Sequence, residues 1–86
     1  MGFAIAVVVA GLAPGSAHSV HIHAGSCGAA IFGRHILILG TIVGGGMGSG
    51  AVSTRVGLTY TTDRYVIVYA NLSPASIIGC SDLGAV

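Results

Sequence analysis

The sequence contains no lysine, no glutamate and no tryptophan, and charged residues make up only 6% of its 86 residues. Ordinary soluble domains are about one quarter charged, so a normally solvated surface is excluded. The net charge of +1 arises from three arginines and two aspartates that form no basic stripe, so we expect no nucleic-acid partner. Surfaces this poor in charge expose apolar patches, which mark interfaces. We therefore expect the chain to bury much of its surface against copies of itself, another partner or lipid.

Long hydrophobic runs are also missing. The longest, residues 3–13 and 36–46, fall short of the roughly 20 residues that a membrane-spanning helix needs, so we expect no transmembrane segment. Residues 1–17 resemble the apolar part of a signal peptide but lack its positive charge. No GxSxG motif, phosphate loop, paired carboxylates or nucleophile–base set is present. The sequence therefore predicts a protein that is not an enzyme.

What the sequence does have is β-branched residues in short runs, separated by glycine and other turn residues. No window has a helical apolar period. We expect a single all-β domain over residues 1–86, built as a small antiparallel Greek-key sandwich or partial barrel. The predicted strands are residues 3–12, 18–23, 36–43, 51–60, 64–70 and 76–80.

Two segments depart from this pattern. Residues 3–10 are apolar on both faces, as in a strand that is covered on both sides, which suggests that another chain supplies one layer. Residues 44–50, GGGMGSG, are predicted either to form a flexible connection or to pack against a neighbour. We expect residues 1–12 and 44–50 to lie at subunit contacts.

Three of the four histidines lie within six positions. His21 and His23 are two apart in a predicted strand, so their side chains share a face and form half of a copper or zinc site. His18 joins them only if the chain turns after Ser19, and His35 is the remaining imidazole. No carboxylate is near to orient the rings. The alternative is that these histidines are polar-face residues with no metal.

Cys27 and Cys80 have neither redox-motif nor zinc-ribbon spacing, so they form a lone disulfide or remain two thiols. Asn71 begins the triplet NLS, which fits the glycosylation pattern, although the following Pro74 disfavours modification. Tyr65 and Tyr69 share one face of a predicted strand, where packing is the default role.

The stretch GLAPGSAHSVHIHAGSC (residues 11–27) resembles the copper-binding strand of Cu/Zn superoxide dismutases, and more closely the secreted chordin-repeat β-domains. The closing segment YVIVYANLSPASIIGCSDL (residues 65–83) is similar to the end of the same fold. The resemblance implies a disulfide between Cys27 and Cys80. A disulfide in turn implies an oxidising compartment, so we expect an extracellular or cell-surface location, with the periplasm as an alternative.

The chain also departs from that family. Tyr69 stands where the family has a copper-ligating histidine, and Ile77 stands where it has the arginine that guides superoxide. Dismutase activity is therefore not expected. The family's domain also begins with a further hairpin that precedes the strand at residues 3–12. Its absence here predicts unpaired strand edges, which another subunit can fill by donating a strand.

These observations predict a secreted, non-enzymatic structural domain that assembles into a filament or another homopolymer without a cofactor. The alternative is a small extracellular or periplasmic copper-binding protein that uses His21 and His23 together with His18 or His35.

Overall fold

The computed structural model describes residues 2–27, 34–58, 62–73 and 76–84, and all regular structure in these ranges is β. The strands are β1 (Phe3–Val9), β2 (Ala17–Ala24), β3 (His35–Val43), β4 (Gly50–Val56), β5 (Arg64–Tyr69) and β6 (Ile77–Leu83). Each predicted strand is therefore present, with its ends moved by a few residues. Tyr60 and Pro74 lie outside the described residues.

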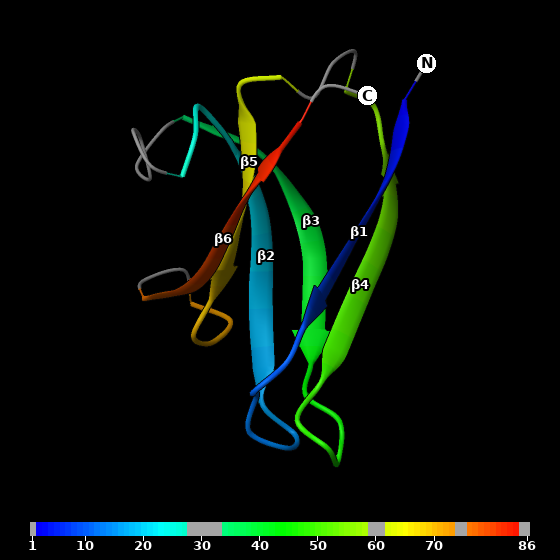
Figure 1. Ribbon diagram of the computed structural model, residues 1–86, viewed down its shortest axis with the longest axis vertical. Helices are drawn as coiled ribbons and strands as arrows, with labels where there is room; N and C mark the ends of the chain where they lie inside the picture. The colour runs from blue at the N-terminus through cyan, green and yellow to red at the C-terminus, as the bar shows by residue number, and fades with distance from the viewer. Residues whose placement is uncertain (1, 28–33, 59–61, 74–75, 85–86) are drawn as a thin grey trace.

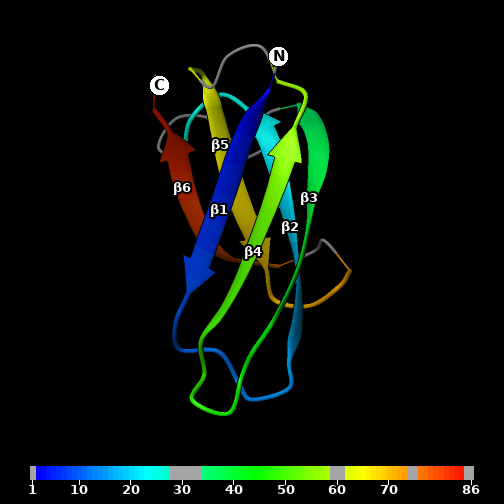
Figure 2. The ribbon, with the colours of Figure 1, turned by 90° about the vertical axis from the view of Figure 1, so that its right-hand side faces the viewer.

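The strands form two sheets in which all neighbours are antiparallel. β1 pairs with β4, and the second sheet has the order β3-β2-β5-β6 (Figure 1). Seen from the side, β1 and β4 lie in front of β2 and β5, so the two sheets form two layers (Figure 2). This arrangement confirms the predicted all-β sandwich.

The core lies between the layers because alternate residues of each strand point inward. Val20 and Ile22 of β2 are fully buried, and Val66 and Val68 of β5 share the same core. The opposite face of β5 carries a second cluster, formed by Tyr65, Ile67 and Tyr69. The main core is completed by Ile5, Leu12, Leu39, Ile42 and Val56.

β1 is shorter than predicted and is covered on one side only within this chain. The strand ends at Val9, and Gly11 then adopts a φ of 78°, a conformation that turns the chain away. Ile5 is buried against the second sheet, whereas Ala4, Ala6 and Val8 are exposed. The apolar outward face of β1 is thus left without a covering layer by the described part of the chain.

The glycine-rich segment at residues 44–50 packs against the chain's own loop at residues 11–16. Gly44 N donates to the Ser16 carbonyl and Gly15 N donates to the Gly44 carbonyl, each at 2.8 Å. Leu12 N donates to the Gly48 carbonyl at 2.7 Å. This segment is therefore held in place by a neighbouring loop of the same chain. A role of residues 44–50 in subunit contacts stays a prediction.

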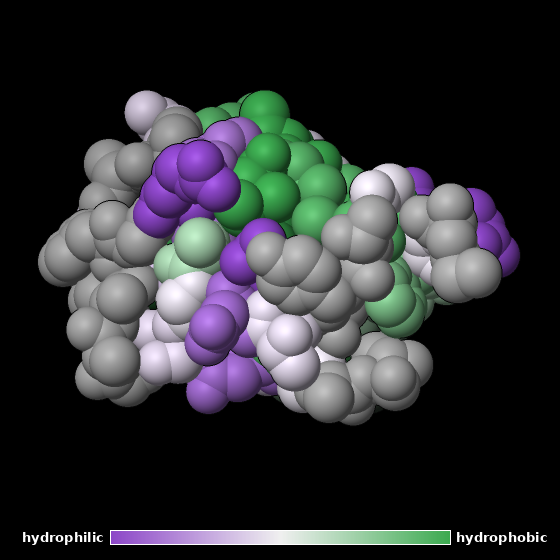
Figure 3. Space-filling model, turned by 90° about the horizontal axis from the view of Figure 1, so that it is seen from above, coloured by the Kyte–Doolittle hydropathy of each residue, from purple (hydrophilic) through white to green (hydrophobic). Residues whose placement is uncertain are grey.

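Several large apolar side chains remain exposed on the described surface: Val8, Ile38, Val43, Met47, Leu72, Ile77 and Ile78. In the space-filling view from above, hydrophobic residues gather in a continuous patch along one side of the molecule (Figure 3). No helix among the described residues is long and apolar enough to cross a membrane.

Candidate functional site

Three imidazoles gather on the outer face of the four-stranded sheet. His21 and His23 come from β2 and His35 comes from β3; we call these three residues the imidazole cluster. The ring centroids lie 4.9 Å apart for His21 and His35, 5.4 Å for His23 and His35, and 6.2 Å for His21 and His23. His21 is buried, His23 is half-buried and His35 is exposed.

The position of His35 depends on two irregularities in the pairing of β2 with β3. The register shifts between Val20 and His21 and again between Ile22 and His23, and the second shift brings His35 opposite His23. Such bulges re-aim side chains at functional sites in other proteins. The sequence identified His35 as a candidate, and the register selects it as the third imidazole.

Two tyrosines of β5 border the imidazole cluster. The Tyr69 ring meets His21 edge-on at 4.9 Å, and its hydroxyl lies 3.3 Å from Nε2 of His23. The Tyr65 ring stacks on His23 at 5.6 Å. These contacts follow from the register, in which β5 lies beside β2 with Tyr65 opposite His23. The tyrosines restrict the orientations open to both imidazoles.

His18 lies apart from the cluster, on the face of β2 that also carries Val20 and Ile22. Its exposed fraction is only 5%. Nδ1 lies 2.8 Å from the Tyr69 carbonyl oxygen, which can only accept, so Nδ1 carries the proton. Nε2 lies 2.7 Å from the hydroxyl of Ser16. The chain does not turn after Ser19, so the structure does not bring His18 together with His21 and His23.

The cluster also has an electrostatic consequence for His21. Its pKa is lowered from the ordinary value of 6.5, first by burial and then by the neighbouring imidazoles of His35 and His23. The pKa of Tyr69 is raised by burial and by Tyr65. Both shifts favour the neutral form at neutral pH. A neutral imidazole is the form that binds a transition metal.

The donor set matches what copper or zinc takes from proteins, because imidazole nitrogens suit both ions. In the side-chain conformations of the structure, however, no group of three or more histidine, cysteine, aspartate or glutamate side chains within the described ranges is arranged to hold a metal ion. Metal binding at the imidazole cluster therefore requires the rings to turn toward a common point.

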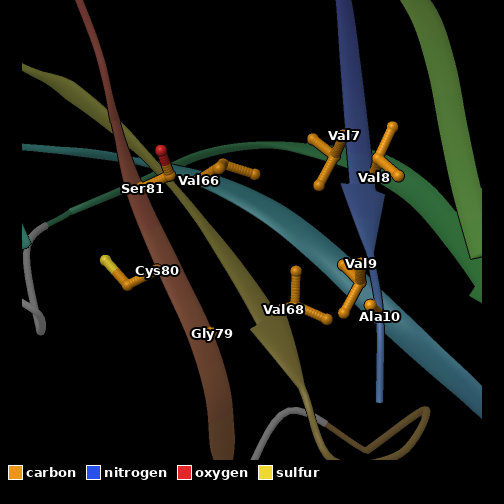
Figure 4. Close-up of a pocket in the computed structure, with 9 residues that line it drawn as sticks. All are labelled: Val7, Val8, Val9, Ala10, Val66, Val68, Gly79, Cys80 and Ser81. Atoms are coloured by element: carbon orange, nitrogen blue, oxygen red, sulfur yellow. The ribbon is translucent and has the colours of Figure 1, made fainter. Parts of the chain in front are cut away.

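A second candidate site is an apolar groove on the open side of the sandwich, between β1 and β6. It measures about 270 Å³. Strand β1 and the residue after it line one side, strand β6 lines the other, and β5 forms the floor (Figure 4). The lining residues are Val7, Val8, Val9 and Ala10 on the first side, Gly79, Cys80 and Ser81 on the second, and Val66 and Val68 on the floor. No charged residue lines the groove.

The strands on both sides of this groove are edge strands. β1 pairs only with β4, and β6 pairs only with β5, within the described chain. Edge strands in soluble proteins are usually protected from pairing with other chains by charged residues, especially lysine, or by proline. β1 has none of these, because its sequence is FAIAVVV. The groove therefore combines uncovered apolar side chains with backbone groups that lack a strand partner.

The disulfide between Cys27 and Cys80 is present, as the sequence resemblance implied. It links the segment that follows β2 with strand β6. Asp82 reinforces this junction, because its carboxylate accepts a hydrogen bond of 2.8 Å from the backbone N–H of Cys27. The junction fixes β6, which forms one side of the groove.

Asn71 is exposed, and its side-chain oxygen accepts a 2.8 Å hydrogen bond from the backbone N–H of Ser73. This contact is a local turn motif. Glycosylation of Asn71 stays a prediction.

Comparison of the chain with models of known protein families, with curated proteins and with solved structures finds no match. The likeness to dismutases and chordin-repeat domains therefore stays a prediction from the residues quoted above. The functional argument depends on the geometry of the imidazole cluster and of the groove.

Proposed function

We propose that this chain is a non-enzymatic structural β-domain that self-associates outside the cytoplasm and forms a filament or another homopolymer. The observation that carries the proposal is the open side of the sandwich, where an uncharged apolar groove lies between the edge strands β1 and β6. Such a surface is stabilised when another strand or sheet covers it.

Composition supports the same function. Charges that keep proteins monomeric are scarce, because only 6% of the residues are charged and the net charge is +1. The exposed apolar side chains add further surface whose removal from water is favourable. The disulfide is compatible with the extracellular or periplasmic location that we propose.

Sedimentation velocity over a wide concentration range, without reducing agent, tests this function, together with electron microscopy of the same sample. We expect species far above the 8.4 kDa mass of one chain, with larger species at higher concentration. A folded chain that sediments as a monomer at every concentration would contradict the proposal. Circular dichroism provides the check that the chain is folded.

A second function is favoured by one specific observation, the presence of His35 beside His21 and His23. Three imidazoles with ring centroids within 6.2 Å of one another make a small copper- or zinc-binding protein the alternative. Binding of one metal ion would require the three rings to turn so that a nitrogen of each meets the ion, and the hydroxyl of Tyr69 lies next to His23. A fourth position would be left for water or another ligand.

Calorimetric titration of the metal-free protein with Cu²⁺ or Zn²⁺ tests the alternative. We expect saturable binding that His23→Ala and His35→Ala each weaken by about tenfold or more, because each removes a ligand. His18→Gln is the control. Because His18 lies on the other face of β2, this change should leave metal binding unchanged. Binding that survives loss of His35, or no saturable binding, would contradict a site at the imidazole cluster.

A further inference from the structure

The hydroxyl of Ser16 lies between two groups that can each take its single proton. Its oxygen is 2.6 Å from the carbonyl oxygen of Ala13 and 2.7 Å from Nε2 of His18. A carbonyl can only accept, and a hydroxyl has one proton to donate. If Ser16 donates to Ala13, its oxygen is an acceptor toward His18. If it donates to His18, the Ala13 carbonyl loses the hydroxyl as a partner.

The other ring nitrogen fixes what each arrangement requires of His18. Nδ1 is 2.8 Å from the Tyr69 carbonyl oxygen and carries a proton. When Ser16 donates to Ala13, Nε2 must carry a proton as well, and the ring is an imidazolium. When His18 is neutral, Nε2 has only a lone pair and receives the Ser16 proton. The protonation state of His18 therefore sets the direction in which the hydroxyl points.

We propose that His18 and Ser16 form a proton-operated switch at this end of the sandwich. When Nε2 takes a proton from water, its new N–H donates to the Ser16 oxygen, and the hydroxyl turns about its Cβ–Oγ bond toward the Ala13 carbonyl. When Nε2 releases the proton, the hydroxyl turns back to the ring. This inference goes beyond the two functions proposed above and depends on neither, because His18 lies on the face of β2 opposite the imidazole cluster.

The surroundings of His18 accommodate both states of the switch. The side chain is buried, so a charge on it has to be stabilised by hydrogen bonds. The imidazolium donates to two oxygens, the Tyr69 carbonyl and the Ser16 hydroxyl. Bonds from a charged donor are about twice as strong as neutral ones. Ser16 is only half-buried, so it gives the proton a way between Nε2 and water.

No other titratable side chain of the described chain faces His18. Strand β1 and the loops at residues 11–16 and 44–50 carry none. The imidazole cluster and the rings of Tyr65 and Tyr69 lie on the outer face of the sheet, whereas His18 lies on the inner face. The charged side chains lie beside the end of β2 or the start of β1, at the other end of the sandwich (Figure 1). These are Arg34, Arg55, Asp63, Arg64 and Asp82.

The switch acts on the contact between two loops. Ala13 and Ser16 are the ends of one turn, in which the backbone N–H of Ser16 donates to the Ala13 carbonyl at 3.0 Å. That carbonyl has a second lone pair, which the hydroxyl takes when His18 is charged. The Ser16 carbonyl in turn accepts the N–H of Gly44, so closing the turn with two bonds also restrains the loop at residues 44–50. We therefore expect the two loops to hold each other more firmly when His18 is protonated.

NMR spectroscopy of the ring and of the turn tests the switch as the pH is changed. At high pH the ring nitrogens of His18 should show a proton on Nδ1 and a lone pair on Nε2, and at low pH a proton on both. The carbonyl carbon resonance of Ala13 should move with the same midpoint as the ring. Protection of the Gly44 N–H against hydrogen exchange should rise about threefold or more once His18 is protonated.

Two serine variants separate the switch from other effects of pH. Ser16→Ala removes the hydroxyl, so the Ala13 resonance should no longer follow His18. Ser19→Ala is the matched control, because this hydroxyl also donates to a backbone carbonyl, that of Leu72 at 3.0 Å, but lies on the other face of β2. It should leave the coupling unchanged. If Ser16→Ala does not fold by circular dichroism, His18→Gln replaces it, since glutamine does not titrate and the Ala13 resonance should then be independent of pH.

Three results would overturn the inference. The first is a neutral ring that carries its proton on Nε2, because Ser16 would then be an acceptor in both states. The second is an Ala13 resonance that ignores His18, or that keeps its response in Ser16→Ala. The third is a ring that stays neutral until the chain unfolds. Solid-state NMR records the same resonances from an assembled sample, so the test does not depend on whether the copies associate.

Discussion

At the scale of single residues, the four histidines divide into two roles. His18 is hydrogen-bonded within the fold to the Tyr69 backbone and to Ser16. His21, His23 and His35 gather on the outer face of the sheet. His21 is the most constrained of these three, because it is buried and lies beside two other imidazoles and the Tyr69 ring.

Stability should therefore depend on pH through His21. Its folded-state pKa lies below the unfolded value of 6.5, so the folded chain binds fewer protons in this range. The contribution of neutral His21 is fully present above the unfolded pKa and is lost as pH falls below about 6.5 toward the folded pKa. We expect the free energy of unfolding in urea to decrease from about pH 8 to about pH 5.

The His21→Gln variant is the control for this prediction. Glutamine does not titrate, so the variant should show a weaker pH dependence than the unmodified chain over the same range. An equal slope in both proteins would show that other groups, and not His21, are responsible.

At the scale of elements, two loops at one end of the sandwich hold each other. The loop at residues 11–16 and the loop at residues 44–50 exchange backbone hydrogen bonds, and their close approach requires glycine. A Cβ at Gly44 would lie 2.5 Å from the Ala13 carbonyl oxygen. By contrast, nothing lies within 4 Å of a Cβ at Gly46 in the same loop.

Gly44→Ala should therefore destabilise the chain by about 1–3 kcal/mol, the usual cost of forcing extra atoms into a packed region. Gly46→Ala is the matched control and should change stability by no more than about 0.5 kcal/mol. Thermal and urea unfolding of the two variants measure the difference. If the Gly44→Ala and Gly46→Ala variants are equally stable, the two loops can move apart to accommodate the added Cβ without a loss of stability.

At the scale of the whole molecule, the disulfide compensates for a small and open core. The bond between Cys27 and Cys80 closes a loop across 53 residues and joins β6 to the segment after β2. One side of the sandwich remains uncovered at the groove, so burial in a single chain is incomplete there. A domain of this size has a total stability of only about 4–13 kcal/mol.

The double variant Cys27→Ala/Cys80→Ala should lose about 4 kcal/mol of stability in the chain-entropy account of a loop of this length. We expect much of the variant to be unfolded at 37 °C in the absence of partner copies, as measured by circular dichroism. Reduction of the unmodified chain should give the same loss. A variant as stable as the oxidised chain would show that the open sandwich needs no crosslink.

The sequence by itself determined the fold class and the approximate strands, because β-branched runs, alternation and glycine turns act locally. It also determined that His21 and His23 share a face, since side chains alternate along any strand. The resemblance supplied the pairing of Cys27 with Cys80, which the structure confirms.

Only the tertiary structure decided which imidazole joins His21 and His23, and where the open surface lies. His35 reaches His23 through a register shift, which depends on how two strands settle against each other and has no local sequence signal. The groove exists because β1 and β6 are both edges on the same side of the sandwich. That relationship joins residues about 70 positions apart, and long-range packing alone brings them together.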